Sequence, residues 1–266
     1  MIDRLFNLSG RVAVVSGAAS GMGRATALAL AEHGADLLLA DLNAERLELT
    51  AQDVIALGRK VIPLTCDVSN PARIAELFAT LDREFGRVDF LANVAGEGLL
   101  VRPEEVTGDQ LQQVFQNLVF GRFRMCQEGG RRMLAAGRGS ILNIGSLASM
   151  TALGRGHIVY SMAMGAVVQM TRELSTEWAS RGVRVNAILP AQVDNPGIQK
   201  RIAADPTIEQ KWLSGIPIGR LGQPTDIQGL AVLLASDASS WITGAIIPMD
   251  GGNLAMNAGG TIGKPA

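Results

Sequence analysis

Short apolar runs rich in β-branched residues alternate with helix-like segments along most of this chain of 266 residues. The first run, "RVAVVSG" at 11–17, stops at a glycine, and helical spacing follows it from Gly23 to Gly34. The same pattern recurs up to a last run, "GAIIPMDGG" at 244–252. Buried parallel strands have this composition, and strands that alternate with helices are joined by right-handed crossovers. The sequence therefore predicts an α/β fold with a doubly wound sheet of seven parallel strands and helices on both faces.

The boundaries of the predicted elements follow from glycines and from changes in hydrophobic period. The predicted strands are 11–17, 35–41, 60–68, 88–96, 140–146, 184–190 and 244–252. The predicted helices are 23–34, 44–58, 71–85, 107–136, 158–180 and 225–236. Because no Pro/Ser-rich linker or internal repeat interrupts this order, we expect a single domain over 1–256 and a glycine-rich tail over 257–266.

Composition and charge exclude several classes of function. The net charge of −1 gives no attraction to nucleic acid or to an anionic membrane, and no apolar run approaches the roughly 20 residues of a membrane span. Cys66 and Cys126 share no short motif, and His33 and His157 are the only histidines, so neither a disulfide framework nor a metal site is expected. The start of the chain lacks the layout of a secretory signal, and we expect a cytoplasmic protein.

A glycine-rich stretch, "SGAASGMG" at 16–23, joins the first predicted strand to the first helix. Glycines there let the backbone approach a pyrophosphate, whose charge the helix N-terminus favours. Asp41 ends the second strand, 18 residues after Gly23, where a carboxylate accepts hydrogen bonds from ribose hydroxyls. Asp41 would repel a 2′-phosphate, and neither Leu42 nor 17–21 supplies a cation, which favours NAD(H) over NADP(H). The alternatives are a plain tight turn and a strand-end charge that faces solvent.

Seven motifs in register resemble those of the short-chain dehydrogenase/reductase (SDR) family. They are "SGAASGMG", Asp41, "CDV" at 66–68, "NVAG" at 93–96, "NIGS" at 143–146, Tyr160 and "MDGG" at 249–252, and they run from about residue 8 to 253. The resemblance implies a Rossmann-type fold, a nicotinamide cofactor and a carbonyl/secondary alcohol substrate pair. It also implies a homotetramer, with a homodimer as the alternative.

The resemblance assigns site residues position by position. Tyr160 would be the general acid or base, Ser146 would hydrogen-bond the substrate oxygen, and Asn117 would position a water for proton relay. Ser146 stands one residue further from Tyr160 than in the family, which leaves Ser149 as a second candidate. The cofactor would be bound by Gly17, Ser20, Gly21, Met22, Gly23, Asp41, Leu42, Asp67, Val68, Asn93, Ala95, Gly96, Tyr160, Pro190, Val193 and Asn195.

Met164 stands where the family has a lysine, four residues after Tyr160. That lysine supplies a positive charge that favours the tyrosine phenolate, and a thioether cannot replace it. The chain has four lysines, Lys60, Lys200, Lys211 and Lys264, and none lies in the helix predicted over 158–180. Asn195 stands in place of the family's threonine and could still bind an amide. The departures therefore gather around the nicotinamide end of the site.

Two hypotheses follow for the function. The first is an NAD(H)-dependent oxidoreductase that still reduces a carbonyl, because Tyr160 starts protonated in that direction. The second is a catalytically impaired or non-catalytic NAD(H)-binding homologue that acts as a sensor or partner subunit. The segment 193–218 is expected to form a lid, and a bulky apolar or alicyclic ketone is the expected substrate. The candidate substrate residues are Leu147, Met150, Leu153, His157 and Trp212, although each apolar one could belong to the core and His157 could make a structural hydrogen bond.

Overall fold

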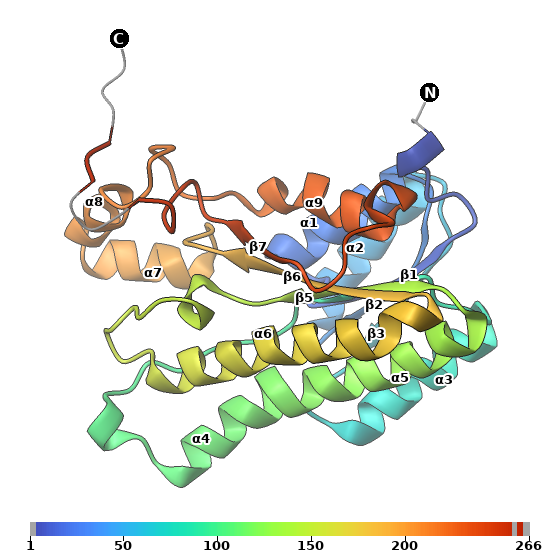
Figure 1. Ribbon diagram of the computed structural model, residues 1–266, viewed down its shortest axis with the longest axis horizontal. Helices are drawn as coiled ribbons and strands as arrows, with labels where there is room; N and C mark the ends of the chain where they lie inside the picture. Colours follow the sequence, from blue (N-terminus) through green and yellow to red (C-terminus); the bar gives the residue numbers. More distant parts are fainter. Residues whose placement is uncertain (1–3, 257–259, 263–266) are drawn as a thin grey trace.

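In the residues that the computed structural model describes, 4–256 and 260–262, seven strands form one parallel sheet in the order β3-β2-β1-β4-β5-β6-β7 (Figure 1). The strands are β1 (Val12–Ser16), β2 (Asp36–Asp41), β3 (Val61–Thr65), β4 (Phe90–Asn93), β5 (Gly139–Ile144), β6 (Val183–Pro190) and β7 (Ile246–Met249). All six neighbouring pairs are parallel. The predicted sheet is confirmed, and most of the tail predicted over 257–266 lies outside the described residues.

Helices cover both faces of this sheet (Figure 1). One layer holds α1 (Gly21–Glu32), α2 (Ala44–Ala56) and α9 (Gln228–Ala235); the other holds α3 (Pro71–Glu84), α4 (Gly108–Phe115), α5 (Arg122–Ala136) and α6 (Ile158–Trp178). Each layer has its own apolar core, one around Leu30, Leu37 and Leu39 and the other around Leu38, Phe78 and Leu91. Successive residues of β2 thus point to opposite faces, as the period of a strand requires.

The helix predicted over 107–136 is not a continuous α-helix. A capping box between Thr107 and Gln110 starts α4, and a π-helical turn over Gln116–Gly121 separates α4 from α5. The chain stays helical through the π-helical turn, so hydrophobic spacing does not distinguish this turn from an α-helix. Single π-helical turns inside α-helices are frequent at functional sites.

The segment 193–218 contains two short helices, α7 (Pro196–Ala204) and α8 (Thr207–Leu213), beyond the carboxyl end of β6 (Figure 1). Asn195 is the N-cap of α7, and Pro196 occupies the first turn, where a missing N–H costs nothing. Trp212, Ile216 and Leu221 form a small buried cluster that holds α8 in place. Among the described helices, none is long and apolar enough to cross a membrane.

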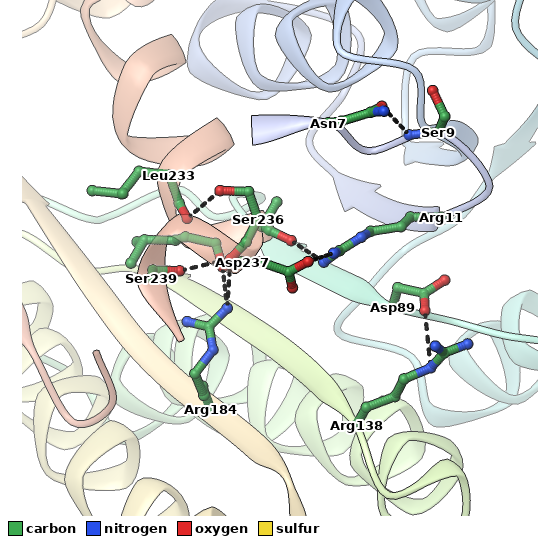
Figure 2. A network of polar contacts seen from close by, with 12 residues as sticks. Asn7, Ser9, Arg11, Asp89, Arg138, Arg184, Leu233, Ser236, Asp237 and Ser239 are labelled. Carbon is green, nitrogen blue, oxygen red and sulfur yellow. Dashed lines mark hydrogen bonds and ion pairs between the residues drawn. The ribbon is translucent and has the colours of Figure 1, made fainter. Parts of the chain in front are cut away.

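The amino ends of the strands meet an arginine-rich network (Figure 2). Arg11 pairs with Asp237 at 2.6 Å, and Arg138 approaches Asp89 at 3.7 Å. Arg184 donates to the backbone oxygens of Leu234 and Ser236, at the C-terminal end of α9. These contacts tie the start of β1 and β6 to the end of α9, where helix carbonyls favour cations.

Candidate active site

The glycine turn between β1 and α1 contains three glycines at which either the backbone angle or a close neighbour disfavours a side chain. Gly17 and Gly21 have φ angles of +72° and +52°. A Cβ on Gly17 would lie 2.9 Å from the nitrogen of Ala95, and a Cβ on Gly23 would lie 2.0 Å from the oxygen of Gly17. The turn therefore packs against the end of β4, at the point where the strand order reverses from β1 toward β4. Open α/β sheets bind ligands in this crevice.

The N-terminus of α1 is free to bind an anion. Its N-cap residue, Ser20, makes no side-chain hydrogen bond to the helix, and the first turn contains no acidic residue. Backbone N–H groups at the start of α1 are thus available to a pyrophosphate, whose negative charge the helix dipole stabilises. These free backbone N–H groups fit the pyrophosphate of a dinucleotide.

Asp41 lies at the end of β2 beside this turn. Its Oδ2 accepts a hydrogen bond from the nitrogen of Ala19 at 3.0 Å, and its Oδ1 accepts one from the nitrogen of Asn43 at 2.9 Å. These bonds hold the carboxylate in place, and each oxygen keeps a lone pair for a hydroxyl group. Leu42 next to it is exposed and uncharged, so this position supplies no cation beside Asp41.

The ends of β3 and β4 carry the remaining residues assigned to the adenosine half. Asp67 accepts two hydrogen bonds from Ser69, and Val68 is buried. Asn93 is also buried, and its amide donates to Asn143 and to the Sγ atom of Cys126, while its Oδ1 has no partner among the described residues. Asn93 thus ties β4 to β5 beneath the crevice, and contact with the ribose remains a prediction for it.

Ser146 and Tyr160 face two adjoining cavities of about 380 and 230 Å³, and both residues line both cavities. Ser146 follows β5 and is buried, and its Oγ accepts a hydrogen bond from the nitrogen of Ala148 at 3.2 Å. Ser149, the second candidate, donates its hydroxyl to the oxygen of Ser146 at 2.6 Å and lines neither cavity. The geometry favours Ser146 as the serine of the site.

Met164 lies one helical turn after Tyr160 on α6 and is 1% exposed. It packs with Leu118, Val159 and Val167 in a cluster between α4, the π-helical turn and α6, and it lines the smaller cavity. Two lysines fall in the segment 193–218, and neither of them, Lys200 or Lys211, lines either cavity. Lys211 lies 3.9 Å from Asp205 instead.

Asn117 lies in the π-helical turn, and its Oδ1 is buried without a hydrogen-bond partner among the described residues. A Cβ on Gly96 would lie 3.6 Å from this oxygen, so Asn117 faces the loop that follows β4. A buried amide oxygen without a partner costs free energy unless a water or ligand pairs with it. A water relay at Asn117 fits this arrangement and remains a prediction.

Arg122 is a residue of the site that the sequence motifs did not indicate. It begins α5, is 4% exposed and lines the smaller cavity with Tyr160 and Met164. Its guanidinium donates to the oxygens of Ile144 at 2.5 Å and Ala95 at 3.0 Å. A signal was available, because Arg122 falls on the buried stripe formed by Leu118, Met125 and Cys126. Burial lowers the pKa of Arg122 to about 10, so it remains a cation at neutral pH.

The larger cavity contains most of the predicted substrate residues. Leu147, Leu153, His157 and Trp212 line it, whereas Met150 is exposed and lines neither cavity. The Nδ1 atom of His157 is 2.8 Å from the oxygen of Gly154, and burial lowers the pKa of His157. Polar side chains contribute as well, among them Glu97, Arg155, Gln192, Arg201 and Asn253. The cavity is therefore less apolar than the expectation of a bulky apolar ketone requires.

The residues predicted to lie beside a nicotinamide, Pro190, Val193 and Asn195, line the smaller cavity. The side chain of Asn195 already accepts from the nitrogen of Ile198 at 3.0 Å and donates to the oxygen of Val193 at 2.8 Å. A contact between Asn195 and a carboxamide would use its second N–H or the second lone pair of its Oδ1. That contact stays a prediction. Within the described residues, no cluster of histidine, cysteine and carboxylate side chains could hold a metal ion.

A third cavity, of about 730 Å³, lies at the other end of the strands, where their amino ends meet. Arg11, Asp89, Arg138 and Arg184 line it, and the contacts in Figure 2 pair these groups with one another or with backbone oxygens. Ligands of open parallel sheets bind at the carboxyl ends of the strands. The candidate active site is therefore the crevice that contains Ser146 and Tyr160.

A glycine turn shaped for a pyrophosphate, next to a serine and a tyrosine in one crevice, defines a nucleotide-dependent oxidoreductase. Comparisons with known proteins agree. Residues 17–253 match the family model adh_short_C2, described as enoyl-(acyl carrier protein) reductase. The chain is 39% identical over 251 residues to D-threitol dehydrogenase of Mycolicibacterium smegmatis, covering 94% of this chain and 95% of the relative. It is 36% identical over 250 residues to NAD-dependent glycerol dehydrogenase of Listeria innocua, with coverages of 94% and 96%.

Solved structures show the same relationship. A protein of Beutenbergia cavernae, described as an NAD(P)-dependent gluconate 5-dehydrogenase with NADP bound at low occupancy, superposes with a TM-score of 0.88 at 35% identity. That match covers 94% of this chain and 99% of the other. The chain belongs to the short-chain dehydrogenase/reductase family, and it is an oxidoreductase of a carbonyl/alcohol pair.

Proposed function

We propose that this protein is an NAD(H)-dependent dehydrogenase/reductase that interconverts a polyhydroxylated secondary alcohol and its ketone. The observation that carries the proposal is the shared position of Ser146 and Tyr160, which line the same two cavities beyond the glycine turn. A bound nicotinamide would supply or accept the hydride. The residues of this chain would bind the substrate oxygen and move its proton.

In the direction of reduction, the Ser146 hydroxyl donates a hydrogen bond to the carbonyl oxygen, and the Tyr160 hydroxyl transfers its proton to that oxygen. Both hydroxyls stabilise the negative charge that develops as hydride reaches the carbon. In oxidation the tyrosine must first lose its proton, and a tyrosine with the ordinary pKa of about 10 is on the order of one-thousandth ionised at pH 7. Oxidation is therefore the direction that suffers more from Met164.

The preference for NAD(H) is supported by Asp41, which is fixed beside the glycine turn by the nitrogens of Ala19 and Asn43. A carboxylate in this position binds the ribose hydroxyls and repels a 2′-phosphate. The Listeria innocua relative is described as NAD-dependent, whereas the Beutenbergia cavernae structure contains NADP. Asp41 and the lack of a cation at Leu42 favour NAD(H) over NADP(H) for this chain.

A polyhydroxylated substrate is supported by the lining of the 380 Å³ cavity beside Ser146 and Tyr160, where Glu97, His157, Gln192 and Asn253 offer donors and acceptors. Several relatives are named for such substrates, including threitol, glycerol and galactitol. This choice replaces the apolar ketone expected from Leu147, Leu153 and Trp212 alone. The segment 193–218 would cover the substrate as a lid.

The competing function is a non-catalytic NAD(H)-binding subunit, favoured by the absence of a lysine at position 164. Single-turnover oxidation of NADH, followed by its absorbance against a panel of ketoses and apolar ketones, separates the two. We expect hydride transfer to at least one ketose, and none in a Tyr160→Phe control. Tight NADH binding without turnover on any ketone, in both proteins, would instead support the binding subunit.

We further propose a cytoplasmic homotetramer. Phe120, Phe123 and Met162 are apolar side chains on the π-helical turn, α5 and α6 that are between 44% and 54% exposed. A helix pair between subunits would bury this face. Cys66 and Cys126 are buried and free, as suits a reducing compartment. Sedimentation equilibrium of the wild type and of Phe123→Glu tests the assembly, and a wild-type monomer would refute it.

A further inference from the structure

Arg122 is a buried cation without a buried anion. It is 4% exposed, and no carboxylate lies within 4.0 Å of it in residues 4–256 and 260–262. Removing an unpaired charge from water costs several kcal/mol, so such residues are rare unless something in the fold uses the charge. The hydrogen bonds of Arg122 to two backbone oxygens lower this cost but do not neutralise the charge.

The guanidinium is held in a fixed place between two strand ends. One nitrogen donates to Ile144, the last residue of β5, and another donates to Ala95, in the loop after β4. A Cβ on Gly96 would lie 2.4 Å from Cδ2 of Leu118 and 3.4 Å from the second nitrogen, so the loop after β4 packs closely against both side chains. A planar fork anchored at two points cannot swing away to solvent, which makes its charge a permanent part of the site.

The fixed charge and Tyr160 border the same cavity of about 230 Å³, which Met164 also lines. Cys126 lies one helical turn after Arg122 on α5, and burial raises its pKa to about 12, so this thiol stays neutral and supplies no counter-charge. Among the described residues that line the cavity, Tyr160 is therefore the ionisable side chain on which the charge can act.

We propose that Arg122 is the positioning residue that supplies, from α5, the positive charge that Met164 does not supply from α6. The inference deepens the proposed function, on which its catalytic meaning rests. A cation close to a phenol favours the phenolate, because opposite charges stabilise each other. During oxidation, the alcohol O–H proton passes to the phenolate oxygen while the C–H hydride leaves for the oxidised cofactor. Arg122 keeps its own proton throughout.

A purely structural role is the alternative. The two hydrogen bonds of Arg122 join the ends of β4 and β5, and a neutral donor could do the same. The two roles differ in what they require, because only the electrostatic role needs the charge. Arg122→Gln keeps amide donors and removes the charge, whereas Arg122→Lys keeps the charge and alters the donors.

The chain itself provides the probe, because Tyr160 is its only tyrosine. The near-ultraviolet band of tyrosinate, recorded during an alkaline titration of the protein without cofactor or substrate, reports on this one side chain. We expect Arg122→Gln to move the midpoint of the titration to higher pH by about 1 unit, and Arg122→Lys to move it by less than half as much. Adding Met164→Lys to Arg122→Gln should bring the midpoint back toward the wild type.

The controls exclude indirect effects. Arg124→Gln, which removes a half-buried arginine of α5 that donates to Gln127, should leave the midpoint unchanged, and Tyr160→Phe supplies the blank. Thermal unfolding verifies that each variant is folded, and Arg122→Met is the second neutral variant if Arg122→Gln is not. The proposal is overturned if the folded neutral variants titrate like the wild type, or if Arg122→Lys shifts the midpoint as much as they do. Since the titration needs no turnover, it separates this inference from the proposed function.

Discussion

Tyr160 and Met164 lie one turn apart on α6 and line the same cavity, with the apolar side chain of Met164 packed against Leu118 and Val167. In this family the second position is expected to carry the ammonium group that assists the tyrosine. Here that assistance has to come from another element or be absent. The relationship between these two residues is the starting point for the first prediction.

Met164→Lys should increase the rate of alcohol oxidation or the affinity for NAD(H), by about tenfold, because a second cation favours the phenolate and can bind the ribose. The variant should also be less stable, since it places an ammonium group in an apolar cluster. Initial rates in both directions and the NADH Kd measure the effect, with Gln52→Lys as the control because it adds the same ammonium group at an exposed position of α2. A loss of both activity and affinity would mean that Met164 itself contributes to the site.

Asp41→Ala should narrow the preference for NADH over NADPH, because it removes both the acceptor for the ribose hydroxyls and the charge that repels a 2′-phosphate. We expect a change of at least tenfold in the ratio of the two Kd values. Leu42→Arg is the complementary variant and should improve NADPH binding by adding a cation at an exposed position. Equal affinity of the wild type for both cofactors would contradict the assignment of Asp41.

Gly23→Ala should abolish cofactor binding and lower the Tm, because its Cβ would lie 2.0 Å from the oxygen of Gly17. Gly229→Ala in α9 is the control, since nothing lies within 4 Å of a Cβ there, and alanine should stabilise that helix by up to about 1 kcal/mol. Calorimetry and NADH titration measure the two effects. A Gly23→Ala variant that binds NADH normally would be inconsistent with the pyrophosphate site.

Ser146→Ala and Ser149→Ala decide which serine acts on the substrate. Removing one donor to a developing oxyanion costs about 100-fold in kcat, and we expect this loss for Ser146. Ser149 uses its hydroxyl to bind the oxygen of Ser146, so its replacement should change kcat by less than tenfold. The reverse order would make Ser149 the serine of the site.

The strands could be predicted because their signals are local. A β-branched run that ends at a glycine specifies a buried strand and the turn after it, as β1 and Gly17 illustrate. The turn then packs where its neighbours in the sheet place it, against Ala95. Asn195 was assigned only to the cofactor, although Asn-Pro at a helix start is also a capping signature, and its amide serves that cap.

Arg122 was missed although its spacing was available in the sequence. It falls on the buried stripe of Leu118, Met125 and Cys126, but a charged side chain is expected at the surface unless it has a partner. Its partners are the backbone oxygens of Ile144 and Ala95, which only the packing of β4 and β5 against the helix brings within reach. Sequence spacing carries no information about those contacts.

The π-helical turn over Gln116–Gly121 accommodates more residues in one turn than an α-helix does. Two buried polar residues depend on it, because Asn117 lies within the turn and Arg122 directly follows it. A change of one residue in the length of this turn would therefore displace polar groups of the crevice while every sequence motif of the family stays intact.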